Sequence, residues 1–232
     1  MALNNYLAQV QRLLHDSSGS LYSTTDLTAY INQGRLQIAS EGMCVRGLFS
    51  LSTVAAQQVY PFSSISVVSL TGASYVLTVR KAGIGTTSLA GRIWDWFYNY
   101  CTLAPATGSP TVWSQLGQGA SGNLYLWKTP TGIETITLDC VVVPVALVND
   151  ATAEVLPYPW TDAVQYYAAY MAYFNAQRTA DADRMWQEFQ KYMQRARDMS
   201  TPTALPRNYT ISNQPSGVPS SSPGIFPGGK NA

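Results

Sequence analysis

The chain has 232 residues and 46% of them are hydrophobic, which is sufficient for a folded body with a sizeable core. Only 12% are charged, and the net charge of +1 argues against a dedicated nucleic-acid-binding protein, since such a protein needs a basic face. The 15 tyrosines favour a surface in permanent contact with other subunits rather than with solvent alone.

Three cysteines, Cys44, Cys101 and Cys140, are odd in number and too widely spaced for a disulfide framework or a zinc site. We expect three reduced and mostly buried thiols, as in a protein that assembles in the cytosol. The first residues, MALNNYLAQVQ, lack the basic and apolar segments of a signal peptide. No apolar stretch approaches the roughly 18 residues of a transmembrane helix, so we expect no membrane partner.

Two amphipathic helices are predicted near the N-terminus. The first covers residues 3–15, where apolar residues recur at intervals of three and four. The second begins after Ser23, a suitable N-cap with Asp26 in the first turn, and ends at Gly42. Gly34 lies on its inner stripe and costs about 1 kcal/mol of helix propensity relative to alanine. This glycine is tolerable if the two helices approach each other closely there.

From about residue 47 to Pro144 the pattern changes to short runs of alternating, β-branched and aromatic residues, separated by Gly, Pro, Ser and Asn. Such runs predict strands in an antiparallel sandwich or a small barrel. Residues 129–132, with the sequence Thr-Pro-Thr-Gly, predict a hairpin loop between the last two strands. The predicted strands cover residues 48–54, 65–71, 75–80, 92–100, 112–117, 123–127 and 133–143.

Helix is predicted again after the Pro-Tyr-Pro sequence at 157–159, beginning at Thr161 or Asp162, and a fourth helix follows from Asp181. One apolar stripe faces the chain's own core. A second stripe is made of tyrosines and needs another partner. Tyrosine suits such a contact because it offers a large contact area and a phenol that hydrogen-bonds at wet interfaces. Either another subunit or the β-rich region of the same chain covers it. The residues that we assign to a subunit interface are Tyr166, Tyr170, Tyr173, Trp186 and Met193.

This order of elements predicts an α+β fold. Each helical half buries too little apolar surface alone, so we expect one four-helix domain made from both chain ends, with the β region as a long insert. The expected divisions are residues 1–46 and 157–199 for the helical domain, 47–145 for the β insert, 146–156 for a connector and 200–232 for an extended arm.

The arm is unlike the rest of the chain. Residues 200–232 hold six prolines and only two charged side chains, Arg207 and Lys230, so neither a helix nor a central strand is expected. Fully extended, the arm reaches about 100 Å at roughly 3.1 Å per residue. Spaced apolar residues favour a strap laid on another subunit over a disordered tail. These apolar residues are Leu205, Tyr209, Ile211, Val218, Ile225 and Phe226.

The sequence offers little for catalysis. Asp95 lies between Trp94 and Trp96 in the predicted strand 92–100, which resembles a sugar platform, but no second carboxylate pairs with it. The only histidine, His15, lies at the end of the first helix, where a cation is mildly stabilising. We therefore predict no catalytic residue, no metal site and no cofactor, and we expect that the protein is not an enzyme.

The helical halves carry a family resemblance. The opening pair contains LAQVQRLLHD at 7–16 and YSTTDLTAYINQGRLQIASEGMCVR at 22–46. In the second half, PYPW at 157–160 precedes an Ala/Tyr-rich helix, and RTADADR at 178–184 leads to a last helix that ends in YMQRARD at 192–198. This pattern resembles the bacteriophage head-to-tail adaptor proteins, which form the neck or tail-accessory-factor rings beneath the portal of short-tailed phages.

The resemblance implies a structural virion protein. Such adaptors form a homo-oligomeric ring, twelvefold in this family, which binds the portal protein above and a tail or nozzle protein below. The C-terminal arm reaches onto the portal. The ring extends the channel for double-stranded DNA, without sequence-specific contacts, and serves genome retention and ejection. The location implied is the virion neck, after assembly in the host cytoplasm.

The alternative is a virion protein that binds carbohydrate or degrades the cell wall with the aromatic strand 92–100. Another tail-linking structural subunit is a further alternative.

Overall fold

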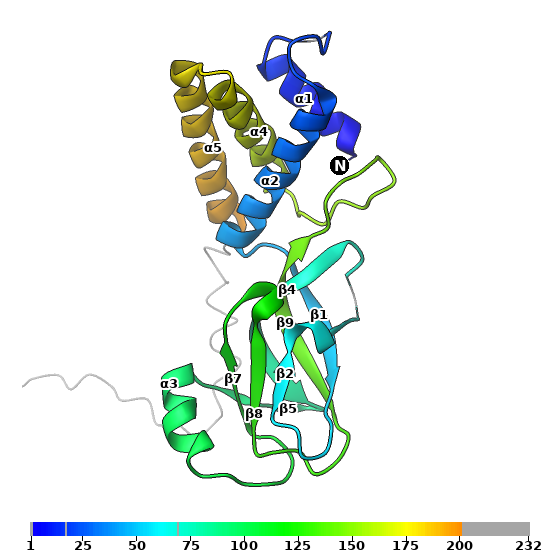
Figure 1. The fold of residues 1–232 in the computed structure, drawn as a ribbon, viewed down its shortest axis with the longest axis vertical. Helices are drawn as coiled ribbons and strands as arrows, with labels where there is room; N and C mark the ends of the chain where they lie inside the picture. Colours follow the sequence, from blue (N-terminus) through cyan, green and yellow to red (C-terminus); the bar gives the residue numbers. More distant parts are fainter. Residues whose placement is uncertain (1, 17, 69, 201–232) are drawn as a thin grey trace, which may run out of the picture.

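The computed structural model describes residues 2–16, 18–68 and 70–200. The molecule is elongated, with a layer of helices at one end and a β-rich region at the other (Figure 1). The predicted α+β class is confirmed. Helices from both ends of the chain pack together, and the segment between them forms two largely antiparallel sheets. The predicted arm anchors, at 205–226, lie outside the described residues.

The N-terminal helices are α1 (Leu3–Leu13) and α2 (Thr24–Gly42). The predicted N-cap of α2 is confirmed, because the Oγ atom of Ser23 accepts a hydrogen bond from the backbone N–H of Asp26 at 3.1 Å. α2 ends at the predicted glycine, and the next residue, Met43, adopts a left-handed conformation with a φ of 46°.

The C-terminal helices are α4 (Thr161–Asn175) and α5 (Thr179–Ser200). They pack against each other, and α4 also packs against α2 and α1. Gly34 of α2 faces Tyr167 of α4, where an added Cβ atom would lie 3.0 Å from the Cδ1 atom of the tyrosine. The close approach at Gly34 is therefore with α4 and not with the first helix. A glycine is needed there because it lets the two helix backbones come together.

Two sheets form the β region, and every described strand pairing is antiparallel except the parallel pair β6–β7. In the first sheet the order is β3 (Ser66–Val67), β1 (Arg46–Ser52), β9 (Thr135–Pro144), β4 (Ala73–Ile84), β5 (Thr87–Ser88). In the second sheet the order is β2 (Val59–Pro61), β8 (Asn123–Trp127), β7 (Val112–Leu116), β6 (Ala90–Gly91). Short 3-10 turns follow β2 and precede β8, at η1 (Phe62–Ser64) and η3 (Gly119–Ser121).

The prediction of a strand at residues 92–100 is wrong. The segment forms α3 (Trp94–Phe97), which continues into the π-helical turn η2 (Tyr98–Thr102). Phe97 and Cys101, four residues apart, are buried, and Trp94 is half-buried. Spacings of three and four are helical. Aromatic residues are common in strands, so their density in this segment favoured a strand over a helix in the prediction.

The prediction of a hairpin loop at residues 129–132 is also wrong. β8 belongs to the second sheet and β9 to the first, so this connection crosses between the sheets. Thr53 fixes the crossing, because its Oγ1 atom donates to the carbonyl O of Gly132 at 2.9 Å and accepts from the N–H of Glu134 at 2.7 Å. The predicted strand at 65–71 is reduced to the two residues of β3.

A buried polar network joins the helices to the connector between β9 and α4. The guanidinium group of Arg35 in α2 makes two hydrogen bonds, both of 2.9 Å, to the carboxylate of Glu154. The hydroxyl of Tyr6 in α1 donates to the same carboxylate at 2.9 Å. Arg35 also donates to the carbonyl O of Val145 at 2.8 Å and to the side chain of Asn32 at 3.1 Å. We call Tyr6, Asn32, Arg35 and Glu154 the waist network.

The waist network is almost fully shielded from water. Only 1% of the Arg35 side chain and 3% of the Glu154 side chain are exposed. The N–H of Leu156 donates to the Glu154 carboxylate at 2.9 Å, so the buried charge has several donors. Burial, and then the nearby carboxylate, raise the pKa of Tyr6 far above its usual value, which keeps its hydroxyl protonated as a donor.

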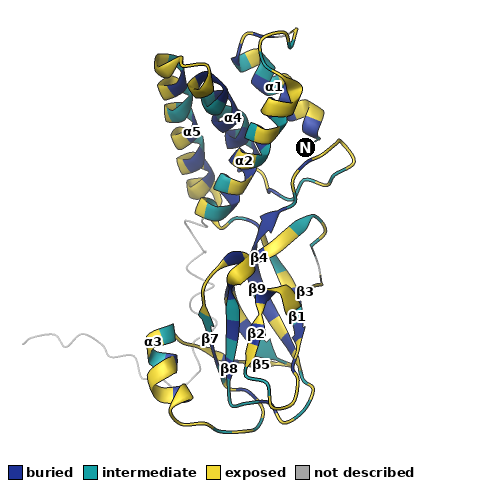
Figure 2. Ribbon diagram, in the orientation of Figure 1, coloured by how far each residue is buried: buried dark blue, intermediate teal, exposed yellow. Residues whose placement is uncertain are grey.

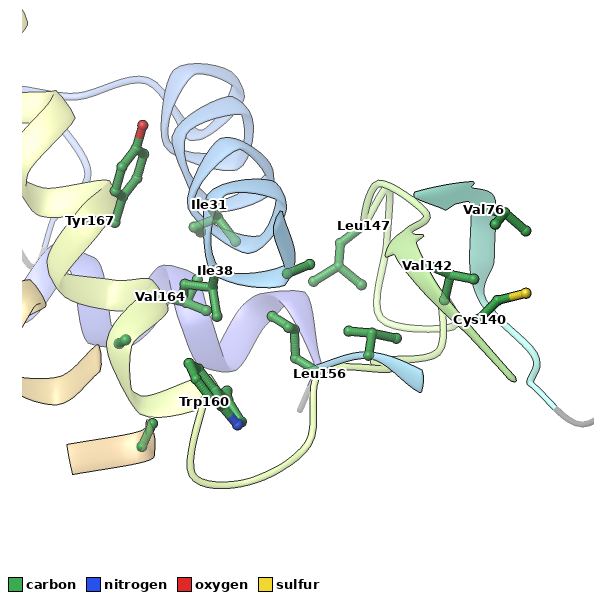
Figure 3. Packing of buried hydrophobic residues seen from close by; sticks show 14 of the residues in the cluster. Ile31, Ile38, Val76, Cys140, Val142, Leu147, Leu156, Trp160, Val164 and Tyr167 are labelled. Carbon is green, nitrogen blue, oxygen red and sulfur yellow. The ribbon is translucent and has the colours of Figure 1, made fainter. Parts of the chain in front are cut away.

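The apolar core continues through this waist. Figure 3 shows Leu147 and Leu156 of the connector between Ile38 of α2 on one side and Val142 of β9 on the other. In Figure 2 the buried residues follow the inner sides of the helices and continue along β9. The helical layer and the β region therefore share one core, and the waist network lies where they meet.

We predict that Glu154→Ala destabilises the protein by about 3–5 kcal/mol, because it leaves the Arg35 charge buried without its partner. Lys191→Gln is the matched control. It removes one side of an exposed ion pair with Glu188 and should cost less than about 1 kcal/mol. The free energy of unfolding in urea measures both. Equal values for the two variants would contradict this role of the waist network.

We also predict that Gly34→Val destabilises the protein by about 1–3 kcal/mol, since the new side chain collides with Tyr167. Gln33→Val, on an exposed position of the same helix, should change the free energy of unfolding by less than about 0.5 kcal/mol. Thermal and chemical denaturation of both variants test this. If Gly34→Val is as stable as Gln33→Val, then α2 and α4 are not in close contact at this glycine.

Candidate interaction surfaces

The residues that the sequence assigned to a subunit interface divide into two groups. Tyr173 and Met193 are buried within the single chain, with 4% and 1% exposed. The hydroxyl of Tyr173 donates to the carbonyl O of Leu13 at 3.0 Å, so this side chain joins α4 to the end of α1. Burial raises the pKa of Tyr173. Tyr166, Tyr170 and Trp186 are half-buried and remain accessible at the surface of α4 and α5.

These accessible side chains belong to two groups of packed aromatic rings on α4 and α5. The rings of Tyr166 and Tyr192 stack with centroids 4.6 Å apart, and the rings of Tyr170 and Trp186 lie 5.1 Å apart. Phe174 packs beside Tyr170 at 5.9 Å and is itself exposed. Burial and the hydrogen bond with Tyr192 raise the pKa of Tyr166. We call these five residues the α4–α5 aromatic face.

A second apolar surface was not predicted from the sequence. It comprises residues 93–103, which carry α3 and η2 and lie at the end of the β region farthest from the helical layer (Figure 1). We call it the α3–η2 projection. Four of its exposed side chains are large and apolar or aromatic: Ile93, Tyr98, Tyr100 and Leu103. Asp95, Asn99 and Thr102 are exposed between them. Helical spacing of Trp94, Phe97 and Cys101 was the signal that could have revealed it.

The inner side of the projection is fixed to the β region. The Trp94 ring packs on the Tyr125 ring of β8 with centroids 4.5 Å apart, and Phe97 is fully buried. Farther along, the indole N–H of Trp127 donates to the carbonyl O of Ala104 at 3.0 Å. The projection is thus a fixed feature of the surface, and no other described residue covers its outer apolar side chains.

The aromatic residues around Asp95 do not form a sugar platform on a strand. Trp94 is turned toward Tyr125, whereas Trp96 stacks on Tyr100 at 5.1 Å with the guanidinium of Arg92 4.9 Å from its ring centre. The strand on which the carbohydrate alternative depended is a helix.

The other chemical candidates are also accounted for by the structure. Burial raises the pKa of the Cys44 and Cys140 thiols to about 12, so neither supplies a thiolate near neutral pH. His15 is exposed just beyond α1. In the described residues, no group of three or more His, Cys, Asp and Glu side chains is placed to hold a metal ion. None of the described helices is both long and apolar enough to cross a membrane.

Comparison with known proteins identifies a family. Among curated proteins the comparison found no match. A family model described as SU10 adaptor protein matches residues 1–209, which include both helical halves and the whole β region. The chain therefore belongs to the SU10 adaptor protein family, in agreement with its resemblance to bacteriophage head-to-tail adaptors.

Proposed function

We propose that the protein is a subunit of a head-to-tail adaptor ring in the neck of a phage particle. In this proposal twelve copies form a ring that binds the portal protein on one side and a tail or nozzle protein on the other. The match to the adaptor family over residues 1–209 is the observation that carries the proposal. The α4–α5 aromatic face supports it, since Tyr166, Tyr170 and Trp186 present contact area to a neighbour.

The charge distribution fits a channel through which DNA passes without sequence-specific contacts. The net charge is +1, and several cations are already paired with carboxylates within the chain, as in Arg35–Glu154 and Arg46–Asp139. A strongly basic lumen would hold the phosphates and slow the movement of DNA. A nearly neutral ring instead lets the DNA slide.

The arm is proposed as the portal-binding segment. It follows α5, whose last residue is held in place because the indole N–H of Trp160 donates to the Oγ atom of Ser200 at 2.9 Å. The described body therefore ends at a fixed point, to which the arm is joined. We retain the division into a helical domain, a β insert, a connector and an arm as part of this proposal, with the helical domain forming the ring.

Electron microscopy of the purified protein, alone and mixed with the portal protein, tests the proposal. We expect closed rings, twelvefold, that stack on the portal. A protein that stays monomeric at high concentration and does not bind the portal would contradict it. Saturable binding to cell-wall polysaccharides would favour the carbohydrate alternative instead.

We predict that deleting residues 201–232 leaves a folded body but abolishes attachment to the portal. The helices that form the core end at Ser200, so the truncated chain should retain its far-UV circular dichroism spectrum. Within the full chain, Tyr209→Ala or Phe226→Ala should weaken portal binding by about 1–4 kcal/mol if each ring fills a pocket. Ser220→Ala is the matched control and should bind normally. Unchanged portal binding by the truncated chain would place the contact in the body.

A further inference from the structure

The α3–η2 projection carries large apolar side chains that the rest of the described chain leaves exposed. Ile93 and Leu103 are 74% and 70% exposed, and Tyr98 and Tyr100 on the same segment are exposed as well. Exposed apolar surface of this kind is typical of protein contacts in soluble proteins. Because Phe97 and Trp94 hold the segment to the β region, little conformational freedom would be lost when a partner binds it.

The same chain carries a groove that is also largely apolar. It has a volume of about 260 Å³ and lies among β1, η1, β3, the beginning of β4 and η3. None of the described residues that line it is charged. We call it the β3–β4 groove, and its principal apolar lining residues are Phe49, Phe62, Ile65, Val67, Tyr75 and Val76.

The projection does not reach the groove within one chain. α3 lies at one side of the β region and β3 at the other (Figure 2). Within the chain, the elements that α3 packs against most are η2 and β7, and neither lines the groove. The chain thus presents a protruding apolar surface and a recessed one on separate sides.

We propose that the α3–η2 projection of one copy of this chain binds in the β3–β4 groove of the next copy. A second copy is favoured as the occupant because each copy supplies one projection and one groove, so a closed ring covers all of them without a further protein. Contacts between unlike surfaces of identical chains are heterologous, and they close into rings when the rotation allows. The proposal rests on the proposed function for ring closure, and it identifies which surfaces meet.

The charges at the two surfaces are compatible with this contact. The outer side chains Ile93, Tyr98, Tyr100 and Leu103 carry no charge, so burying them in an uncharged groove removes no ion from water. The exposed carboxylate of Asp95 in α3 has to stay in water at the rim of the contact. The phenol groups of the tyrosines can keep a hydrogen bond at the rim.

The contact also sets the tilt of the subunits. The groove includes Ala73 and Tyr75, which pair with Pro144 and Val143 at the end of β9 nearest the helical layer. The projection lies at the opposite end of the β region (Figure 1). In a closed ring the two contacting surfaces must lie at equal height, so the long axis of each subunit must be inclined to the ring axis.

Two variants of the full chain test the proposal. Leu103→Asp places a charge on the projection, and Val67→Asp places one in the groove. Ile133→Asp is the matched control, since Ile133 is 83% exposed and belongs to neither surface. Native mass spectrometry and analytical ultracentrifugation measure the assembly, and circular dichroism checks the fold. Tyr100→Ser, at an exposed position of the projection, replaces Leu103→Asp if that variant does not fold.

We expect each surface variant to raise the dissociation constant between copies more than tenfold, because a carboxylate would be buried without a partner. The control should assemble like the unmodified protein. An equimolar mixture of Leu103→Asp and Val67→Asp should form heterodimers, since one intact projection and one intact groove remain and restore this contact once.

Two results would overturn the proposal and leave the adaptor ring standing. Rings formed by both surface variants would show that other surfaces hold the copies together. A mixture that stays monomeric would show that the projection and the groove do not bind each other. A monomeric unmodified protein, with and without the portal protein, would instead contradict the proposed function itself.

Discussion

The buried carboxylate of Glu154 binds side chains from α1 and α2, and it belongs to the connector that follows the β region. Tyr6, Arg35 and Glu154 are far apart in the sequence, yet their polar atoms meet at 2.9 Å in a site closed to water. Tyr6 and Arg35 supply the hydrogen-bond donors that the Glu154 carboxylate needs. A displacement of the connector would therefore leave an unpaired charge in an apolar interior. The network therefore holds the connector, and with it the carbonyl of Val145 just after β9, against α2.

A fixed waist matters for the proposed ring because the two candidate contact surfaces lie far apart on the molecule. The α4–α5 aromatic face belongs to the helical layer, whereas the α3–η2 projection lies at the remote end of the β region (Figure 1). If the two regions moved independently, contacts at both ends would each incur a separate entropic cost. In a rigid subunit, one contact positions the other, which favours a ring of uniform geometry.

Local signals in the sequence predicted the helices well and the β pairings poorly. The N-cap at Ser23 and the end at Gly42 were visible because capping depends on neighbouring residues. Gly34 indicated a close approach, but its partner Tyr167 lies in the other half of the chain. The crossing of residues 129–132 between sheets could not be read locally, because β8 and β9 choose partners through distant contacts.

For the candidate surfaces too, local sequence signals were informative and contacts between distant residues could not be predicted. Helical periodicity identified Tyr166, Tyr170 and Trp186, but it could not distinguish them from Tyr173 and Met193, which the chain buries itself. The projection was missed because a dense run of aromatic residues fits a strand and a helix almost equally well. Arg35 and Glu154 were not singled out either, since nothing in the sequence shows that two residues 119 positions apart will form an ion pair.

We propose that other copies of this chain complete its surface within an adaptor ring. A cryo-electron microscopy map of the neck of the intact particle is the decisive measurement. We expect this chain as a ring between portal and tail, with the α4–α5 aromatic face and the α3–η2 projection both covered by neighbouring subunits. A map in which the chain lies elsewhere in the particle, or in which both surfaces remain open to solvent, would contradict it.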